Sequence, residues 1–447
     1  TATGARAATA TLSAASASSV PPHRITTLDS GLRVATEHMS SVRSAALGFY
    51  VGAGSRGEET GEAGLSHFLE HMLFRGTDRF ASAEIDQLFD GMGAELNAGT
   101  DKEATTVYAR MLDQHLPRAF DVMADMVWRP AFNDVDPERE VVLEEIAMYD
   151  DDPQDTVFDV LGDAVFGDHP LGRPIIGRAP VIRDTPVPAI AAFHARRYVP
   201  GAVVIAAAGN VDHDAVVELA ERTLAGLRSG EAAPVPDAAP GSPVARVRFQ
   251  VKETEQVHVC LGGHGLPRGD DRRFALRVLD AIFGGLSSSR LFQSVREERG
   301  LAYAVYSFTG QFTDTGQIGL YVGTRPDNLV EAMEVVDTEL RGLRERPASE
   351  DELARARENV KARVVLAMES SSARMNRLGG SILYGLPLLE ADEVMAKVDA
   401  VTLGDLRELV DELWAPERLS AAGIGPSQEA FSDAVAPVCP AAEPVTA

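Results

Sequence analysis

Two histidines and a glutamate stand close enough in the sequence to act on one metal ion. They lie in the segment His67-Phe68-Leu69-Glu70-His71. On a helix that turns about 100° per residue, His71 lies about 40° from His67, and Glu70 lies about 60° to its other side. Imidazoles spaced in this way can bind one Zn²⁺, and the neighbouring carboxylate can take a proton from water. The alternative is a pair of hydrogen-bonded histidines without a metal, which Glu70 disfavours.

The residues around this segment predict a buried helix. Residues 62–75 contain no proline, and only Gly64 weakens a helix there. Apolar side chains occupy most of the remaining circumference, so the helix would be buried with one polar face. These side chains are Leu65, Phe68, Leu69, Met72 and Leu73.

A site with two histidines needs a third ligand, and residues 137–149 predict a second helix that can supply it. Glu138 and Glu145 fall inside the apolar arc of this helix, whereas Glu140 and Glu144 fall on its polar side. Burying an unpaired carboxylate costs roughly several kcal/mol, so Glu138 and Glu145 need partners. Zinc and its histidines would supply one, and buried arginines are the alternative.

The text from Gly64 to Thr77 resembles the insulinase/pitrilysin superfamily, because His-x-x-Glu-His is the inverzincin signature. It is most similar to the mitochondrial-processing-peptidase branch and its bacterial homologues, and the resemblance extends over about residues 23–433. It implies that Glu145 completes a zinc site with His67 and His71, that Glu138 supports this site, and that Glu70 is the catalytic base.

The resemblance also implies substrate-binding residues. Asn97 and Ala98 match an edge-strand element that pairs with the substrate backbone, and Arg296 and Tyr303 match a substrate-contacting pair in the second half. From the residues alone, Arg296 would be a solvated helix charge and Tyr303 a half-buried strand residue.

Asp155 and Asp159 match acids that accept a basic side chain near the scissile bond in the processing peptidases. At positions i and i+4 of a helix, both would face one way and could bind a guanidinium together. The alternative is a solvated, acidic helix start, which the helix dipole favours.

The two halves of the chain look alike. A strand at 44–52 precedes the helix around His67, and a strand at 257–263 precedes a helix over 273–283. We therefore expect an α+β fold of two duplicated domains, each an antiparallel sheet with helices packed on it. The second half has no His-x-x-Glu-His motif, so we expect one zinc ion per chain.

The expected boundaries follow from composition. A Pro-rich stretch around 229–243 reads as a linker. We predict a disordered leader over 1–22, a zinc-bearing domain over 23–228, a linker over 229–244, a homologous domain without metal over 245–433, and a flexible tail over 434–447.

Composition limits the function classes. The formal net charge of −25 disfavours nucleic acid and anionic lipid as partners, and would attract basic peptides. No run of about 18 apolar residues predicts a membrane span. Two cysteines, Cys260 and Cys439, support no disulfide framework, which indicates a reducing compartment. We expect the bacterial cytoplasm, with a mitochondrial location as the alternative.

Together these features predict a zinc-dependent endopeptidase. Its substrate would be a peptide or an unfolded polypeptide, bound in extended form in a chamber between the domains. A homodimer is implied by the resemblance, and a heterodimer with an inactive homologue is the alternative. The competing function is that of a non-catalytic structural or partner subunit.

Overall fold

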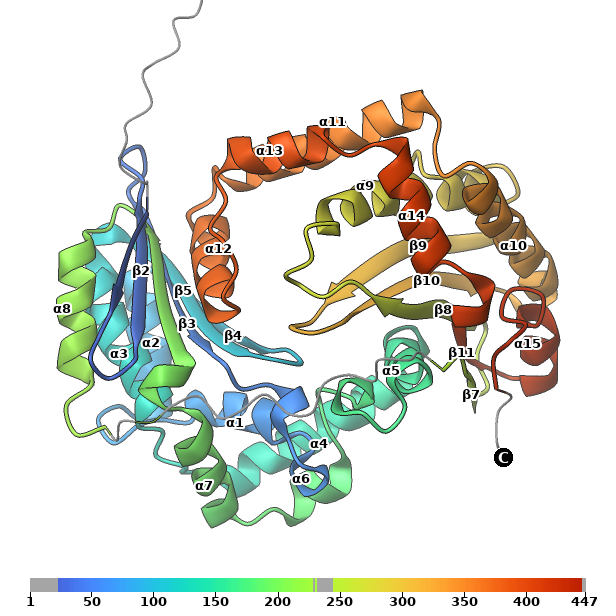
Figure 1. Ribbon diagram of the computed structural model, residues 1–447. Coiled ribbons are helices and arrows are strands. Elements are labelled where there is room, and N and C mark those ends of the chain that lie inside the picture. The colour runs from blue at the N-terminus through green and yellow to red at the C-terminus, as the bar shows by residue number, and fades with distance from the viewer. Residues whose placement is uncertain (1–22, 228–229, 231–243, 444–447) are drawn as a thin grey trace, which may run out of the picture.

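The computed structural model describes residues 23–227, 230 and 244–443. They form two β-sheets with helices packed on them, as predicted for an α+β fold. Figure 1 shows the sheets facing each other, with α4 and α5 along one border and α11 and α12 along the opposite border. No helix in the described part is long and apolar enough to cross a membrane. The predicted leader and most of the predicted linker lie outside the described residues.

The two sheets share one topology. The first has the strand order β1-β2-β6-β3-β5-β4 and the second β7-β11-β8-β10-β9. Apart from β1, order and direction agree strand by strand, which confirms the predicted duplication. The strands are β1 (His23–Thr27), β2 (Arg33–His38), β3 (Ser44–Val51), β4 (Glu95–Thr100), β5 (Thr105–Leu112), β6 (Val203–Gly209), β7 (Val247–Val251), β8 (Val257–Gly265), β9 (Ala302–Gln311), β10 (Gly316–Thr324) and β11 (Ser420–Gly425).

Each sheet differs from the expected antiparallel arrangement at one pair of strands. β6 runs parallel to β2, and β11 runs parallel to β7. Both β6 and β11 follow long helical connections, which can return the chain in the parallel direction, whereas a short hairpin cannot. Every residue of β6 and of β11 is buried, as expected for interior strands covered on both faces.

The helices repeat in the same order in each half. Those predicted over 62–75, 137–149 and 273–283 are confirmed as α1, α4 and α9. The helices are α1 (Leu65–Leu73), α2 (Ser82–Met92), α3 (Leu116–Trp128), α4 (Val135–Asp151), α5 (Pro153–Phe166), α6 (Ala179–Asp184), α7 (Val187–Arg197), α8 (His213–Thr223), α9 (Arg273–Phe283), α10 (Leu329–Glu345), α11 (Glu350–Ala367), α12 (Ser371–Leu383), α13 (Ala391–Asp399), α14 (Leu403–Leu413) and α15 (Gln428–Val435).

The halves exchange one helix each. α5 follows α4 but packs on β7, β8 and β11 of the second sheet, and α12 packs on β2, β3 and β6 of the first. Val157 and Leu161 of α5 are buried in a cluster with Tyr321. Met375 and Leu378 of α12 are buried against the first sheet. Neither sheet is therefore covered by its own half alone.

Ion pairs add to this contact between the halves. The Glu37 carboxylate on β2 is fully buried and binds Arg374 and Arg377 of α12. The buried Arg56 guanidinium lies 2.8 Å from Glu103 and 2.7 Å from Asp314, which belongs to the turn between β9 and β10. Because these acids are buried or half-buried, each needs its partner from the other half or from a neighbouring loop.

Residues 434–443 differ from the expected flexible tail. Ala434, Val435, Val438 and Cys439 are buried in the core of the second half. The backbone of Glu443 exchanges hydrogen bonds with that of Ala245 and Val247. Apolar side chains spaced among the prolines and alanines supply the burial that composition alone does not indicate.

Packing of α12 on the first sheet predicts opposite effects for two adjacent glycines. A Cβ on Gly379 would overlap the ring of Tyr50, whereas one on Gly380 meets nothing within 4 Å. Gly379→Ala should lower the free energy of unfolding by about 1–3 kcal/mol through overpacking. Gly380→Ala, the matched control, should raise it by about 0.5–1 kcal/mol through helix propensity. Urea unfolding measures both, and equal effects would contradict this packing.

Candidate metal centre

Contacts at its start and along its apolar face fix the position of helix α1. Gly64 precedes it with a φ of 101°, a left-handed conformation that favours glycine. The buried Glu58 carboxylate accepts hydrogen bonds from the backbone N–H of Gly64 at 2.8 Å and of Ser66 at 2.6 Å. It thereby satisfies free N–H groups at the helix start and places negative charge there. Burial raises the pKa of Glu58 to about 7.

The apolar face of α1 fixes the direction of its polar residues. Phe68, Leu69, Met72 and Leu73 are fully buried in the first core. His67, Glu70 and His71 remain partly accessible on the other side, as the periodicity predicts.

Helix α4 brings Glu145 to both histidines. His67 Nε2 lies 3.6 Å from Glu145 Oε1, and His71 Nε2 lies 3.3 Å from Glu145 Oε2. The three possible ligand atoms all lie within 4.8 Å of one another. Ligands about 2.0–2.1 Å from a tetrahedral zinc are about 3.4 Å apart, so the spacing fits this ion. Glu145 Oε2 is also buried without a hydrogen bond from the described residues, and a cation would satisfy it.

Glu138 orients His71. Its Oε1 lies 2.7 Å from His71 Nδ1, and its other oxygen is paired with Arg75. A carboxylate only accepts, so Nδ1 carries the proton and Nε2 keeps its lone pair toward Glu145. The sequence predicted Glu138 but missed Arg75, although Arg75 follows His71 by one helical turn on the same face.

The protonation state of His67 suits this residue to metal binding. Burial, and then the charge of His71, lower the pKa of His67 to about 4. His67 is therefore neutral at neutral pH, the form that binds a metal ion.

The Glu70 side chain extends from α1 toward the edge strand β4. Its Oε2 accepts a hydrogen bond of 2.6 Å from the Thr100 hydroxyl at the end of β4. Burial raises the pKa of Glu70, while this hydrogen bond opposes the shift. A carboxylate held in this way can accept a proton from water, and its raised pKa makes it a better base than a solvated glutamate. The contact with Thr100 was not predicted from the sequence.

Asn97 and Ala98 lie on β4, which is the outermost strand of the first sheet. Its backbone pairs with β5 on one side only, with Asn97 opposite Tyr108 and Ala98 opposite Val107. No other strand of the described structure pairs with the second side of β4, and α1 packs beside this strand. An added strand could therefore lie along β4 next to Glu70.

Arg296 and Tyr303 lie together at the start of β9 in the second half. Arg296 belongs to a π-helical turn, Phe292–Glu297, and its Nη1 donates a 2.8 Å hydrogen bond to the Tyr303 backbone oxygen. Its guanidinium lies 4.5 Å from the centre of the Tyr303 ring, which is 78% exposed. Within the described part of the chain, no contact joins either residue to the ligands His67, His71 and Glu145.

Asp155 and Asp159 lie on α5 but in different surroundings. Asp159 accepts a 2.9 Å hydrogen bond from the Tyr149 hydroxyl and faces Lys102, and burial raises the pKa of Asp159. It lines a pocket of about 1100 Å³ with Tyr149. The Asp155 side chain is exposed in the first turn of α5, which fits the acidic helix start. The two carboxylates are thus not equivalent.

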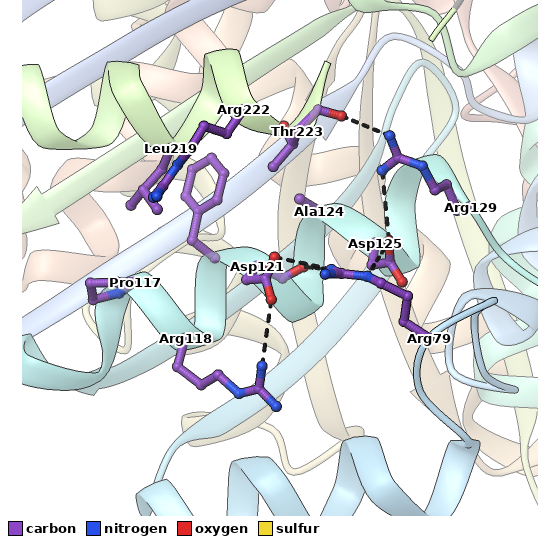
Figure 2. Close-up of a pocket in the computed structure, with 11 residues that line it drawn as sticks. Arg79, Pro117, Arg118, Asp121, Ala124, Asp125, Arg129, Leu219, Arg222 and Thr223 are labelled. Carbon is purple, nitrogen blue, oxygen red and sulfur yellow. Dashed lines mark hydrogen bonds and ion pairs between the residues drawn. The ribbon is translucent and has the colours of Figure 1, made fainter. Parts of the chain in front are cut away.

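A separate pocket of about 700 Å³ lies between α3 and α8 (Figure 2). These helices cover the face of the first sheet that lies opposite α12 (Figure 1). Its most buried acid, Asp125, binds Arg79 at 3.2 Å and Arg129 at 3.6 Å. A second acid, Asp121, binds Arg79 at 3.0 Å. These ion pairs occupy the main charged groups, and the lining contains no histidine or cysteine that could bind a metal.

Comparison with known proteins identifies the family of this chain. Residues 33–179 match the family model of the insulinase family, peptidase family M16, and residues 187–360 match that of the peptidase M16 inactive domain. The chain therefore belongs to the insulinase family, M16. The matched ranges do not follow the two halves, so the domain boundaries stay predictions.

Curated relatives cover nearly the whole chain. A Streptomyces coelicolor protein named "uncharacterized zinc protease" is 41% identical over 417 residues, which are 91% of this chain and 90% of that protein. A Bacillus subtilis protein with the same description is 37% identical over 408 residues, covering 90% and 99%. Among solved structures, a protease from Helicobacter pylori has a TM-score of 0.86 at 23% identity, covering 91% of this chain and all of that one, which shows the same fold.

The geometry at α4 predicts which acid holds the metal. Glu145→Gln should weaken zinc binding by more than roughly 100-fold, because loss of a supporting partner alone costs about 10–100-fold. Glu144→Gln is the matched control, since Glu144 is the exposed neighbour and points away. Zinc titration against a competing chelator measures both. Unchanged affinity in Glu145→Gln would contradict the assignment.

Proposed function

We propose that the chain is a zinc-dependent endopeptidase that cleaves peptides bound in extended form. The observation that carries this proposal is the placement of Glu70, His67, His71 and Glu145 around one point beside the free edge of β4. Membership in the insulinase family and the names of the bacterial relatives support it.

In this proposal, His67, His71 and Glu145 hold one zinc ion, and Glu138 with Arg75 holds His71 in its tautomer. Bound zinc supplies a Lewis acid that polarises the scissile carbonyl. Glu70 takes the proton of the attacking water and returns it to the leaving amine. The backbone of β4 at Asn97 and Ala98 aligns the substrate as an added strand.

Arg296 and Tyr303 belong to the second half, and no contact in the described structure joins either of them to His67, His71 or Glu145. Both are held together at the start of β9, and the exposed Tyr303 hydroxyl is free to donate to a substrate. We propose that closing of the second half over bound peptide brings this pair to the substrate, where Tyr303 stabilises the developing oxyanion.

The proposal includes an oligomeric state and a cellular location. We propose a homodimer, because one chain carries both the metal ligands and the Arg296–Tyr303 pair, with an inactive partner chain as the alternative. We place the protein in the bacterial cytoplasm: the relatives are bacterial, and Cys260 and Cys439 are free, buried thiols.

A substitution at Glu70 distinguishes a peptidase from a non-catalytic subunit. Glu70→Gln should lower kcat by at least a thousandfold, because an amide cannot accept the proton, while one zinc per chain stays bound. Hydrolysis of a diverse peptide mixture, followed by mass spectrometry with and without chelator, measures the loss. The exposed Glu144→Gln is the control. Turnover within tenfold of wild type in Glu70→Gln would refute the assigned base, and no hydrolysis by the zinc-loaded wild type would favour the non-catalytic subunit.

A preference for Arg near the cut is a finer part of the proposal. Asp155 and Asp159 lie on α5, directly after the ligand helix α4, and the exposed Asp155 carboxylate is accessible to a guanidinium. A charge-assisted hydrogen bond contributes about 1.5–3 kcal/mol, so an Arg-for-Ala peptide should gain roughly 10–150-fold in kcat/KM.

The double variant Asp155→Asn/Asp159→Asn should remove most of this gain and leave the Ala peptide unchanged. Asp86→Asn, an exposed acid on α2, is the matched control. If the gain is absent in the wild type, or survives the double change, the proposed role of these acids is wrong. The single variants show which acid acts, since Asp159 is already bound by Tyr149.

A further inference from the structure

The second half holds a pocket where the first half holds its metal centre. In the duplicated order, α9 corresponds to α1, α11 to α4, and the edge strand β9 to the edge strand β4. α1 packs on α4 and β4, and α9 packs on α11 and β9. Asp280 on α9 accepts a 2.6 Å hydrogen bond from Ser307 on β9, as Glu70 on α1 does from Thr100 on β4.

This pocket has a volume of about 390 Å³ and a different set of polar groups. Arg277 and Asp280 line it from α9, and Asn359 and Arg363 line it from α11. Val360 and Val364 form its apolar wall. With two arginines and one aspartate it has a net positive charge, in a chain whose formal net charge is −25.

The two guanidinium groups form no ion pair in the described structure, although the charge of Arg363 acts on Asp280 in the same pocket. None of its hydrogen bonds or ion pairs involves Arg277 or Arg363 side chains, whereas Arg79 and Arg129 in Figure 2 both bind Asp125. Burial lowers the pKa of Arg277, and the neighbouring Arg273 adds to this effect. Asp280 is already bound by Ser307, and burial raises its pKa to about 6. Two accessible arginines beside a single aspartate leave a net positive charge that favours an anionic ligand, and carboxylates match guanidinium geometry best.

Asn359 indicates that the ligand carries a hydrogen-bond donor as well as a negative charge. Asn359 Oδ1 is buried and accepts no hydrogen bond from the described residues. An amide oxygen needs a donor, which a carboxylate lacks and a peptide N–H supplies. The adjacent β9 is the outermost strand of its sheet, so its free edge can pair with an extended peptide.

We propose that this pocket binds the C-terminal residue of a peptide that lies along β9. Arg277 and Arg363 bind the terminal carboxylate. Asn359 Oδ1 accepts a hydrogen bond from the N–H of the terminal residue. The valines contact its side chain. This inference rests on the proposed function only in taking peptides as the ligands, and it adds a second peptide-binding site, in the half that lacks the metal.

The test compares one fluorescent, uncleaved peptide with a free C-terminal carboxylate and its C-terminally amidated twin. Fluorescence anisotropy gives the Kd of each for the zinc-loaded, full-length Glu70→Gln protein. The acid should bind at least tenfold more tightly than the amide. Adding Arg277→Gln/Arg363→Gln should abolish this difference by weakening only the acid. Arg355→Gln, an exposed arginine of α11 outside the pocket, is the matched control and should preserve it.

Further binding measurements identify the source of the carboxylate. An amidated peptide with an Asp side chain near its end should not regain the affinity, and millimolar acetate or inorganic phosphate should not displace the acid peptide. Recovery by the Asp side chain, or displacement by either anion, would overturn the assignment to a peptide C-terminus. Equal affinity for acid and amide, or a difference that survives the double change, would overturn the pocket itself. The measurement requires no turnover, so its failure is distinct from failure of the proposed peptidase activity.

Discussion

Burial of α5 on the opposite sheet is the constraint on which the metal centre depends. α4 carries Glu145, and only Asp152, the N-cap of α5, separates the two helices. The direction of α4 is therefore fixed at its far end by packing between Val157, Leu161 and the second sheet. Without that sheet, α5 would expose its apolar side, and α4 would keep only the anchor that Val142 and Ile146 provide in the first core. The exchange of α5 for α12 thus makes the two halves one structural unit and ties the geometry of the candidate metal centre to the contact between them.

Pairing of buried acids explains why so many charges can surround α1. Glu58 binds the start of this helix, Glu138 lies between His71 and Arg75, and Glu70 accepts from Thr100. Each of these contacts offsets part of the cost of removing a carboxylate from water. The oxygen of Glu145 that faces His71 has no such partner in the described structure. The arrangement therefore leaves negative charge without a hydrogen-bond donor at the point in the described structure where His67, His71 and Glu145 could hold a cation.

The duplicated halves show how one scaffold carries different chemistry. Order and direction of the strands agree, and each edge strand has a helix packed beside it. Apolar residues build this scaffold in each half, whereas a few polar residues on α1 and α4, or on α9 and α11, decide what can bind. Histidines and a glutamate favour a metal ion at α1, and unpaired arginines favour an anion at α9.

The sequence alone determined the helices, and their local periodicity indicated the candidate metal ligands. The apolar stripe of α1 and the buried arc of α4 selected His67, His71 and Glu145, and excluded Glu144, because side-chain direction on a helix follows from spacing. The similarity of the two halves likewise predicted two similar sheets. Residues 434–443 were expected to be flexible because their composition does not show which core they join. Only the tertiary structure decided the parallel pairing of β2 with β6 and the exchange of α5 and α12. It also decided the contacts of Glu58, Arg75 and Thr100 around α1. These features join residues far apart in the chain, and they are set by which surfaces are buried together, a choice that no local pattern encodes.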